Sequence, residues 1–542
     1  MRKGRRSSSR ALATLLLSAL LGCGLDQNEL KSGPIAASIE PGEVLPSAPA
    51  LLEAGKRTYE KHCLSCHGPT VNGAGDAAYL LYPRPRDFTL GEYRLVSTWE
   101  SVPTDRDLFR TISRGMPGSA MPSWAHLDEK TRWGLVHYVK SFSTRSFDVP
   151  EPEDPHGANQ EGKGEIQPPR EAAFFDSGRA RARSLFTQAC APCHGLSGRG
   201  DGQQEQQDSK GLPTRPRDLT AGVFKGDPKP EHVYRRIVAG LPGSPMPMNP
   251  YLYGDDAWHL THYVLEMSSE ELRRKVEMKT MRLVARRVAE LPSHPDASVW
   301  AQAEAVNVPL MPLWWRPERP EEVAVKAVHD GRELALLLIW SDETYDHTAI
   351  RPQDFRDAAA VQFSLTTDPP FLAMGQKGSA CNIWMWKSER QADLEPAFQD
   401  LDKIYPHMGI DSYPNLLRSP LEQPTRHAVT LESDPTFVTA WGAGNIVSDP
   451  TRKSSVEDLT AEGFGTLKAR PRVDQKVFAV GAYATGSYRV LFRRALDGGA
   501  KESVFLKPGK TVPIAFAIWN GSAGDRDGKK SVTIWQQLVV AP

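Results

Sequence analysis

Cysteine is scarce in this chain, which has six in 542 residues. Four of the six form two Cys-x-x-Cys pairs, and the other two, Cys23 and Cys381, stand alone. A disulfide framework therefore cannot be built without breaking one of these pairs or using Cys23. We expect Cys381 to be a small buried core residue.

An excess of charge is also missing, because 66 Lys and Arg residues balance 66 Asp and Glu residues. This neutrality, with no basic stripe, argues against nucleic-acid binding. Long apolar runs are rare as well. Residues 11–21 form one, but it is too short to span a bilayer as a mature helix.

One short motif, Cys-x-x-Cys-His, occurs twice. A Cys-x-x-Cys pair alone also suits a redox dithiol or half of a zinc site. The histidine directly after the second cysteine is instead typical of covalent haem attachment, in which two thiols bond the porphyrin and the imidazole binds the iron. The sequence therefore predicts two covalent c haems, held by Cys63, Cys66, His67, Cys190, Cys193 and His194.

A Met-Pro pair follows each motif at nearly the same distance. Met121 stands 58 residues after Cys63, and Met246 stands 56 residues after Cys190. We expect these methionines to be the second axial ligands. An iron with both axial positions filled carries electrons and has no vacancy for a substrate.

The two motifs belong to an internal repeat with a period near 127 residues. The order of the repeated segments resembles the small class I cytochrome c domain, so we expect two all-α domains of that kind. The matching segments are 51–62 with 179–189, 84–89 with 215–220, 114–122 with 239–247, and 133–139 with 258–264.

The repeat also separates the competing iron ligands. Met116 and Met248 each lack a methionine at the matching position. His137 and His262 do recur, but the Trp and Tyr spacing around them indicates helix packing.

A repeated Arg-Pro-Arg-Asp has two interpretations. It is either a proline-fixed loop with solvated charges, or a site where Arg86 and Arg217 pair with haem propionates, since a guanidinium fork fits a carboxylate. The residues alone leave both open.

The N-terminus has the features of a secretory signal. Residues 2–10 are basic, an apolar run follows, and Leu20-Leu21-Gly22-Cys23 ends it. This resembles a bacterial lipoprotein signal and implies a protein lipid-anchored through Cys23 on the periplasmic side of a membrane. The alternative is an ordinary signal peptide in which Cys23 is incidental.

From about residue 295 the pattern changes to strands. Residues 323–340 are two β-rich runs joined at Asp330-Gly331, a strong hairpin signal. We predict an all-β, immunoglobulin-like sandwich. Its further strands are expected at 359–365, 382–386, 428–432, 477–482, 488–493, 514–519 and 532–539.

The predicted fold is therefore multidomain, with two all-α domains before an all-β sandwich. The expected divisions are a signal peptide 1–22, a tether 23–48, cytochrome c domains 49–145 and 173–268 with a linker 146–172 between them, a helical linker 269–294 and the sandwich 295–542.

Several separated segments of the last region resemble the haem b-binding γ subunit of type II molybdenum enzymes, a group that includes ethylbenzene, dimethylsulfide, chlorate, selenate and nitrite-oxidising complexes. The resemblance covers roughly residues 295–542 and implies one b haem held in the sandwich by a Met and a Lys. The segments are 324–327, 338–342, 355–363, 370–375, 382–387, 443–445 and 461–466.

The resemblance assigns the methionine role to Met374 and the lysine role to Lys453, with Lys468 next. From the residues alone, Met374 is a core or loop methionine, with Met385 and Met408 as equal candidates, and Lys453 is a solvated charge. The γ subunits of that group are usually the sandwich alone, whereas this chain places two c-type domains before it.

These features predict a non-catalytic subunit that relays electrons between molybdenum and iron–sulfur catalytic subunits and the respiratory chain. The expected route runs from an iron–sulfur cluster to the b haem and then to the c haems, or in the reverse direction. A second hypothesis makes the sandwich a haem-free binding module with Trp314 and Trp315 as exposed platforms. A third, a dihaem enzyme, requires an open iron, and the matching Met-Pro loops argue against it.

Overall fold

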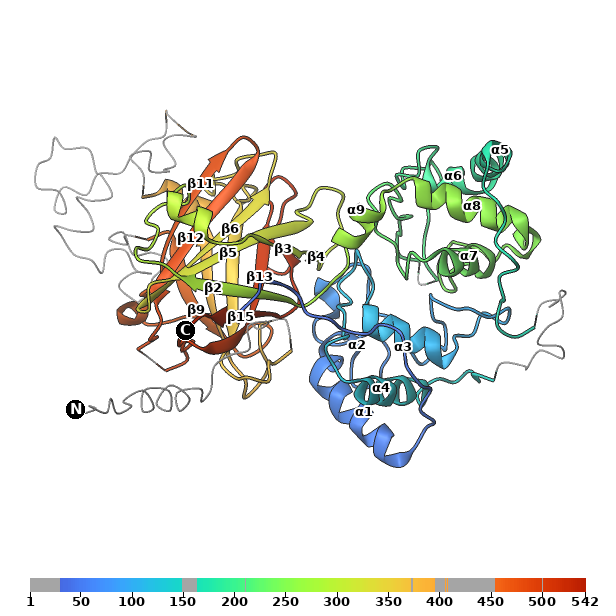
Figure 1. Ribbon diagram of the computed structural model, residues 1–542, viewed down its shortest axis with the longest axis horizontal. Coiled ribbons are helices and arrows are strands. Elements are labelled where there is room, and N and C mark those ends of the chain that lie inside the picture. Colours follow the sequence, from blue (N-terminus) through green and yellow to red (C-terminus); the bar gives the residue numbers. More distant parts are fainter. Residues whose placement is uncertain are drawn as a thin grey trace, which may run out of the picture.

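The structure is a computed structural model that describes residues 30–148, 163–209, 211–371, 374–394, 405, 407, 454–499 and 501–542. Two helical domains lie beside a β-sandwich, with the short helix α9 (Glu270–Lys275) between the second helical domain and the sandwich (Figure 1). Among the helices described, none combines the length and apolar character that a bilayer crossing requires.

The first helical domain is built on the crossing of α1 (Pro49–His62) and α4 (Glu129–Lys140). A Cβ added at Gly55 would lie 2.0 Å from the carbonyl oxygen of Gly134, so glycine permits the close approach of the two helices. The domain also contains α2 (Leu64–His67) and α3 (Asp105–Arg114).

The second helical domain repeats this order. Its helices are α5 (Asp176–Leu185), the π-helical turn η2 (Phe186–Cys190), α6 (Ala191–His194), α7 (Pro230–Ala239) and α8 (Asp255–Glu266). The tryptophans of the C-terminal helices that were expected to pack, Trp133 and Trp258, are both buried and belong to one apolar cluster that runs through both domains.

The third part is a sandwich whose strands follow one path, β10-β9-β8-β7-β13-β15-β2-β5-β6-β12-β11. The path folds back on itself, so that the inward side chains of both halves, such as Phe363, Phe516 and Tyr488, share one core. The strands are β2 (Met281–Arg287), β3 (Val306–Pro309), β4 (Met311–Pro312), β5 (Glu322–His329), β6 (Glu333–Ser341), β7 (Ala358–Ser364), β8 (Cys381–Lys387), β9 (Val456–Ala461), β10 (Lys468–Ala469), β11 (Phe478–Ala484), β12 (Ser487–Ala495), β13 (Lys510–Trp519), β14 (Ser531–Val532) and β15 (Gln536–Val540).

The Asp-Gly hairpin is present as predicted, because β5 and β6 pair antiparallel around a turn in which Gly331 has φ 93°. The immunoglobulin-like strand order is not confirmed. β2 pairs in parallel with both β15 and β5, which makes the sheet mixed. The strand expected at 428–432 lies outside the described residues.

The expectation of helix throughout residues 269–294 is wrong. After α9, the chain enters β2, whose Leu283 and Ala285 are buried in the sandwich core. Strand pairing and burial on the core face override the helical charge pattern at this position.

The described parts of the expected tether and linker are docked on the domains. β1 (Gly33–Pro34) pairs with β2, and Arg132 of α4 donates to the carbonyl of Ser38. In the linker, Ile166 is fully buried and its N–H donates to the carbonyl of Ser97 at 2.7 Å.

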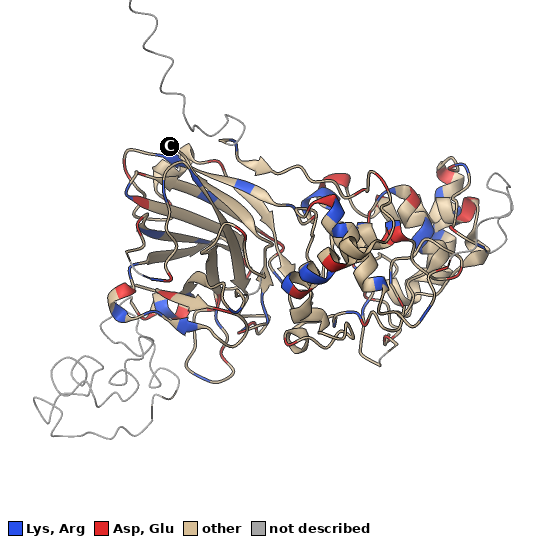
Figure 2. Ribbon diagram, turned by 90° about the horizontal axis from the view of Figure 1, so that it is seen from below, with Lys and Arg blue, Asp and Glu red and all other residues tan. Residues whose placement is uncertain are grey.

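Charges are distributed as the neutral composition suggests. In the view of Figure 2, basic and acidic residues alternate over the helical domains, and the sandwich strands carry few of either.

Candidate functional site: a cavity from the first domain to the sandwich

One cavity of about 630 Å³ joins the first helical domain to the sandwich. Cys63, Cys66, His67 and Met121 line it on the helical side, and Met374 lines it on the sandwich side. The structure thus brings five of the predicted haem-holding residues to the wall of a single cavity.

The surroundings of His67 suit an iron ligand. Its Nδ1 forms a 3.0 Å hydrogen bond with the carbonyl oxygen of Arg86, which leaves the other ring nitrogen available to bind a metal. Its ring stacks on Phe88 at 4.4 Å. Burial lowers the pKa of His67 to about 4, so the imidazole is neutral, as a metal ligand must be.

The loop that carries Met121 is closed by a hydrogen bond from the N–H of Met116 to the Met121 carbonyl at 3.0 Å. Gly115 has φ 72°, and a Cβ there would lie 2.4 Å from the Pro122 carbonyl oxygen. Because Met116 also lines the cavity, the repeat and not the cavity favours Met121. The second domain has the same loop: the N–H of Leu241 bonds the Met246 carbonyl at 3.1 Å, and Gly240, with φ 68°, would place a Cβ 2.4 Å from the Pro247 carbonyl oxygen.

The second motif lies outside this cavity, since none of its residues is among the lining. Burial lowers the pKa of His194, and the nearby Lys225 lowers it further, while the Arg217 backbone partly offsets this. The Cys193 thiol lies 3.2 Å from Nε2 of Gln206.

The two histidines considered as rival ligands have polar neighbours away from the cavity. His137 Nε2 lies 2.7 Å from the Leu45 carbonyl oxygen, and His262 Nε2 lies 3.0 Å from Oε1 of Glu171. Neither lines the cavity, which agrees with their interpretation as packing residues.

On the sandwich side, four alanines form the floor of the cavity. Ala358 and Ala360 of β7 lie beside Ala515 and Ala517 of β13, and Ala360 is paired directly with Ala517. The alternate side chains of these strands, such as Val361, Phe363 and Ile518, belong to the core on the opposite face, whereas Gln362 and Trp519 line the cavity beside the alanines. The small side chains leave room for a flat apolar group against the sheet, and the sequence analysis did not identify them.

Met374 lines the cavity and packs against the apolar cluster that contains the two alanines of β7. Its backbone has φ 66°, a left-handed conformation that is uncommon outside glycine, and its carbonyl accepts a hydrogen bond from Gly463 at 2.8 Å. Met385 also lines the cavity, so it stays a candidate. Met408 lies outside the described residues.

The lysines assigned by resemblance are not found in the cavity wall. Lys453 lies outside the described residues. The Lys468 side chain is 65% exposed, lies 3.7 Å from Glu502, and does not line the cavity.

Among the described residues, two lysines of the sandwich do line it. Lys387 is paired with Glu457 at 3.2 Å. Lys530 has its Nζ 4.8 Å from the centre of the Trp519 ring, and burial lowers its pKa to about 8. A lowered pKa favours the neutral amine that iron ligation requires, so Lys530 fits the role better than Lys468.

Comparison with known proteins matches each of the three domains to a family. Residues 297–531 match the family Ethylbenzene dehydrogenase, residues 50–139 match Cytochrome C oxidase, cbb3-type, subunit III, and residues 180–268 match Cytochrome c. This chain joins an ethylbenzene dehydrogenase-type γ-subunit domain to two cytochrome c domains.

Three proteins illustrate the similarity. A haem subunit assigned to respiratory nitrate reductase in Haloferax mediterranei is 24% identical over 46% of this chain and 69% of its own length. The γ subunit of chlorate reductase from Ideonella dechloratans is 25% identical over 45% of this chain and 78% of its own length. A chain of the solved Kuenenia stuttgartiensis reducing HAO-like protein complex is 34% identical, with 43% of this chain and 100% of that chain covered and a TM-score of 0.36.

In the ethylbenzene dehydrogenase-type domain, the paired tryptophans are not exposed platforms. The Trp314 ring packs on Tyr82 of the first cytochrome c domain at 5.3 Å, and the N–H of Trp315 donates to the Tyr82 carbonyl at 2.7 Å. Both side chains are partly buried at this contact. The hypothesis of a surface-binding module thereby loses the feature on which it rested.

Proposed function

We propose that this protein is the electron-transfer subunit of a molybdenum and iron–sulfur oxidoreductase, with two c haems and one b haem. The observation that carries the proposal is the single cavity, because the first Cys-x-x-Cys-His motif and Met374 stand in its wall together. Haem supplies a one-electron couple when bound.

The residues that would hold the three haems are named by motif and position. Covalent attachment falls to the two cysteine pairs, and axial ligation to His67 with Met121 and to His194 with Met246. In the sandwich, Met374 lies beside the alanine floor, and Lys530 is the described lysine whose setting suits ligation. Lys453 stays a candidate for the same role.

Partners and location follow from different arguments. Similar proteins are named as subunits of nitrate and chlorate reductases, which supports catalytic subunits as the partners of this chain. The signal-like N-terminus supports lipid anchoring through Cys23 on the periplasmic side, with the respiratory chain as the second partner.

A reoxidation experiment tests the relay. The purified, fully reduced protein is mixed rapidly with an oxidised soluble c-type cytochrome, and the b and c haem absorption bands are followed separately. We expect all three haems to be oxidised, and oxidation of the b haem to slow severalfold in Cys63→Ala/Cys66→Ala, which lacks the neighbouring covalent haem. An unchanged rate in that variant would contradict the relay.

A further inference from the structure

Four basic side chains line the large cavity where the two cytochrome c domains meet. Arg86 and Arg94 come from the first domain, and Arg217 and Lys225 come from the second. All four line the large cavity, so its wall carries positive charge from both domains.

These cations have few partners in the protein. Arg94 lies 3.9 Å from Asp208, but Lys225 forms no hydrogen bond or ion pair with any of the residues described. Nη2 of Arg86 and Nε of Arg217 are buried without a hydrogen bond to the described residues. Because a buried, unpaired cation is costly, the cluster calls for an anion in the cavity.

The two arginines also cross between the domains. Nη1 of Arg217 donates to the Gly118 carbonyl at 2.8 Å, in the methionine loop of the first domain. A Cβ at Gly118 would lie 2.9 Å from Nη1 of Arg217, and a Cβ at Gly243 in the second loop would lie 2.8 Å from Nη1 of Arg86. Glycine in each loop leaves the space that the guanidinium of the other domain fills.

We propose that Arg217 and Lys225 of the second cytochrome c domain complete the haem site of the first, by holding the carboxylates of the porphyrin attached at Cys63 and Cys66. This inference rests on the proposed function, because it needs a haem at the first motif. Carboxylates fit the cluster since a guanidinium binds them through paired hydrogen bonds and an ammonium binds them as a point charge. The first haem is then sensitive to charges on the second domain.

The test is a potentiometric titration of the holoprotein. Loss of a positive charge disfavours the reduced iron, so Lys225→Gln should lower the reduction equilibrium constant of the first c haem about tenfold, or about 59 mV for one electron. The titration resolves one component for each haem. Met121→His changes the component of the first cytochrome c domain, and Met246→His changes that of the second, so the two variants assign the components to their domains. Lys229→Gln, an exposed lysine of the same domain that pairs with Glu40, is the matched control and should shift neither.

The component that shifts in the titration decides whether the haem site is shared between the domains. A downward shift of the component marked by Met121→His, with a smaller shift in Arg217→Lys than in Arg217→Gln, supports the shared site. A shift confined to the component marked by Met246→His, or none at all, overturns it. Absence of covalent haem in the parent protein would instead refute the proposed function.

Discussion

At the scale of single residues, the proposed haem ligands differ in how far the sequence could predict them. The cysteines and histidine predicted to hold each c haem are neighbours in the chain and occur twice, so local spacing was enough to predict them. Lys530 stands far along the chain from Met374, and only the pairing of β13 with β14 and β7 brings its segment to the cavity. No local pattern distinguishes such a lysine from a solvated one.

The lysine assignment gives the first prediction. Lys530→Gln should lose most of the extractable b haem and keep both covalent haems, because an amide is a poor iron ligand. Lys468→Gln, on an exposed side chain outside the cavity, is the control and should keep all three. If Lys453→Gln and not Lys530→Gln loses the b haem, the ligand is the lysine outside the described residues.

The methionine has a similar test. Met374→Leu retains the volume of the side chain but removes the thioether, so it should weaken retention of the b haem with little effect on unfolding. Acid–acetone extraction measures the b haem, and thermal unfolding checks the fold. Met385→Leu serves as the comparison, and loss of b haem only in that variant would move the ligand to β8.

At the scale of elements, the methionine loops show why the internal repeat could be recognised from the sequence. Each loop needs a glycine with positive φ in close contact with a proline carbonyl, and this requirement appears in the sequence as the glycine that recurs six residues before Met121 and Met246. The strand β2 could not be predicted from the sequence, because its burial depends on parallel neighbouring strands that are remote in sequence. The alanine floor could not be predicted for the same reason, since its alanines come from two strands, β7 and β13, that are far apart in the sequence.

Gly115→Ala should displace the methionine loop. The new Cβ would meet the Pro122 carbonyl, in addition to the roughly 1–3 kcal/mol that this positive-φ extended conformation costs a residue other than glycine. We expect loss of the methionine-to-iron absorption band and a lower potential for the first c haem. Gly211→Ala has the same positive φ with nothing within 4 Å and should show neither effect. Equal spectra for both variants would contradict the assignment of this loop.

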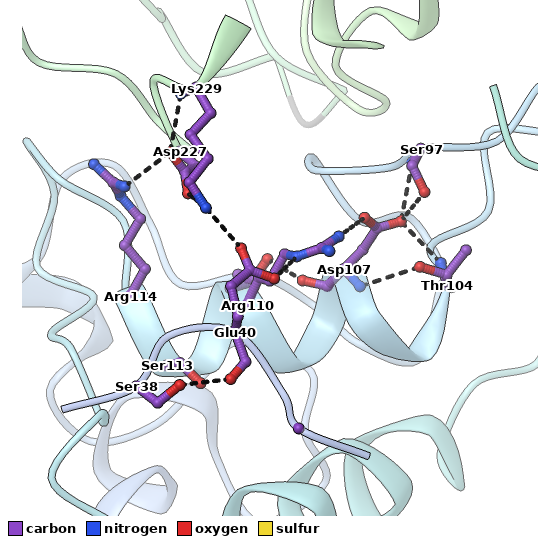
Figure 3. Close-up of polar contacts among 12 residues, drawn as sticks. Ser38, Glu40, Ser97, Thr104, Asp107, Arg110, Ser113, Arg114, Asp227 and Lys229 are labelled. Carbon is purple, nitrogen blue, oxygen red and sulfur yellow. Dashed lines mark hydrogen bonds and ion pairs between the residues drawn. The ribbon is translucent and has the colours of Figure 1, made fainter. Parts of the chain in front are cut away.

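At the scale of the whole molecule, the three domains are joined by specific contacts. Glu40, on the segment before α1, accepts from Arg110 of the first cytochrome c domain at 2.8 Å and lies 3.5 Å from Lys229 of the second (Figure 3). Tyr82 contacts Pro213 of the second domain and Leu313 of the sandwich. These contacts hold the domains in one arrangement. The sequence predicted the separate domains but not the contacts between them.

The interface should be sensitive to acid. Burial first, and then Arg110, Arg235 and Arg236, lower the pKa of His232 below its ordinary value near 6.5, against the opposing effect of Asp227. The unfolded chain therefore binds a proton that the folded protein does not, and stability falls as the pH drops below about 6.5. His232→Gln should reduce the fall in melting temperature between about pH 7 and pH 5, a window above the range in which the Glu40 carboxylate is protonated. An unchanged pH dependence would show that His232 is not buried at a closed interface.

The most direct test of the account is a haem count. A pyridine haemochrome spectrum of the purified protein, combined with acid–acetone extraction, separates covalent from loosely held haem. The account predicts two covalent haems and one extractable b haem per chain. Two covalent haems with no b haem, in protein matured with an adequate haem supply, would contradict an electron relay that includes the sandwich.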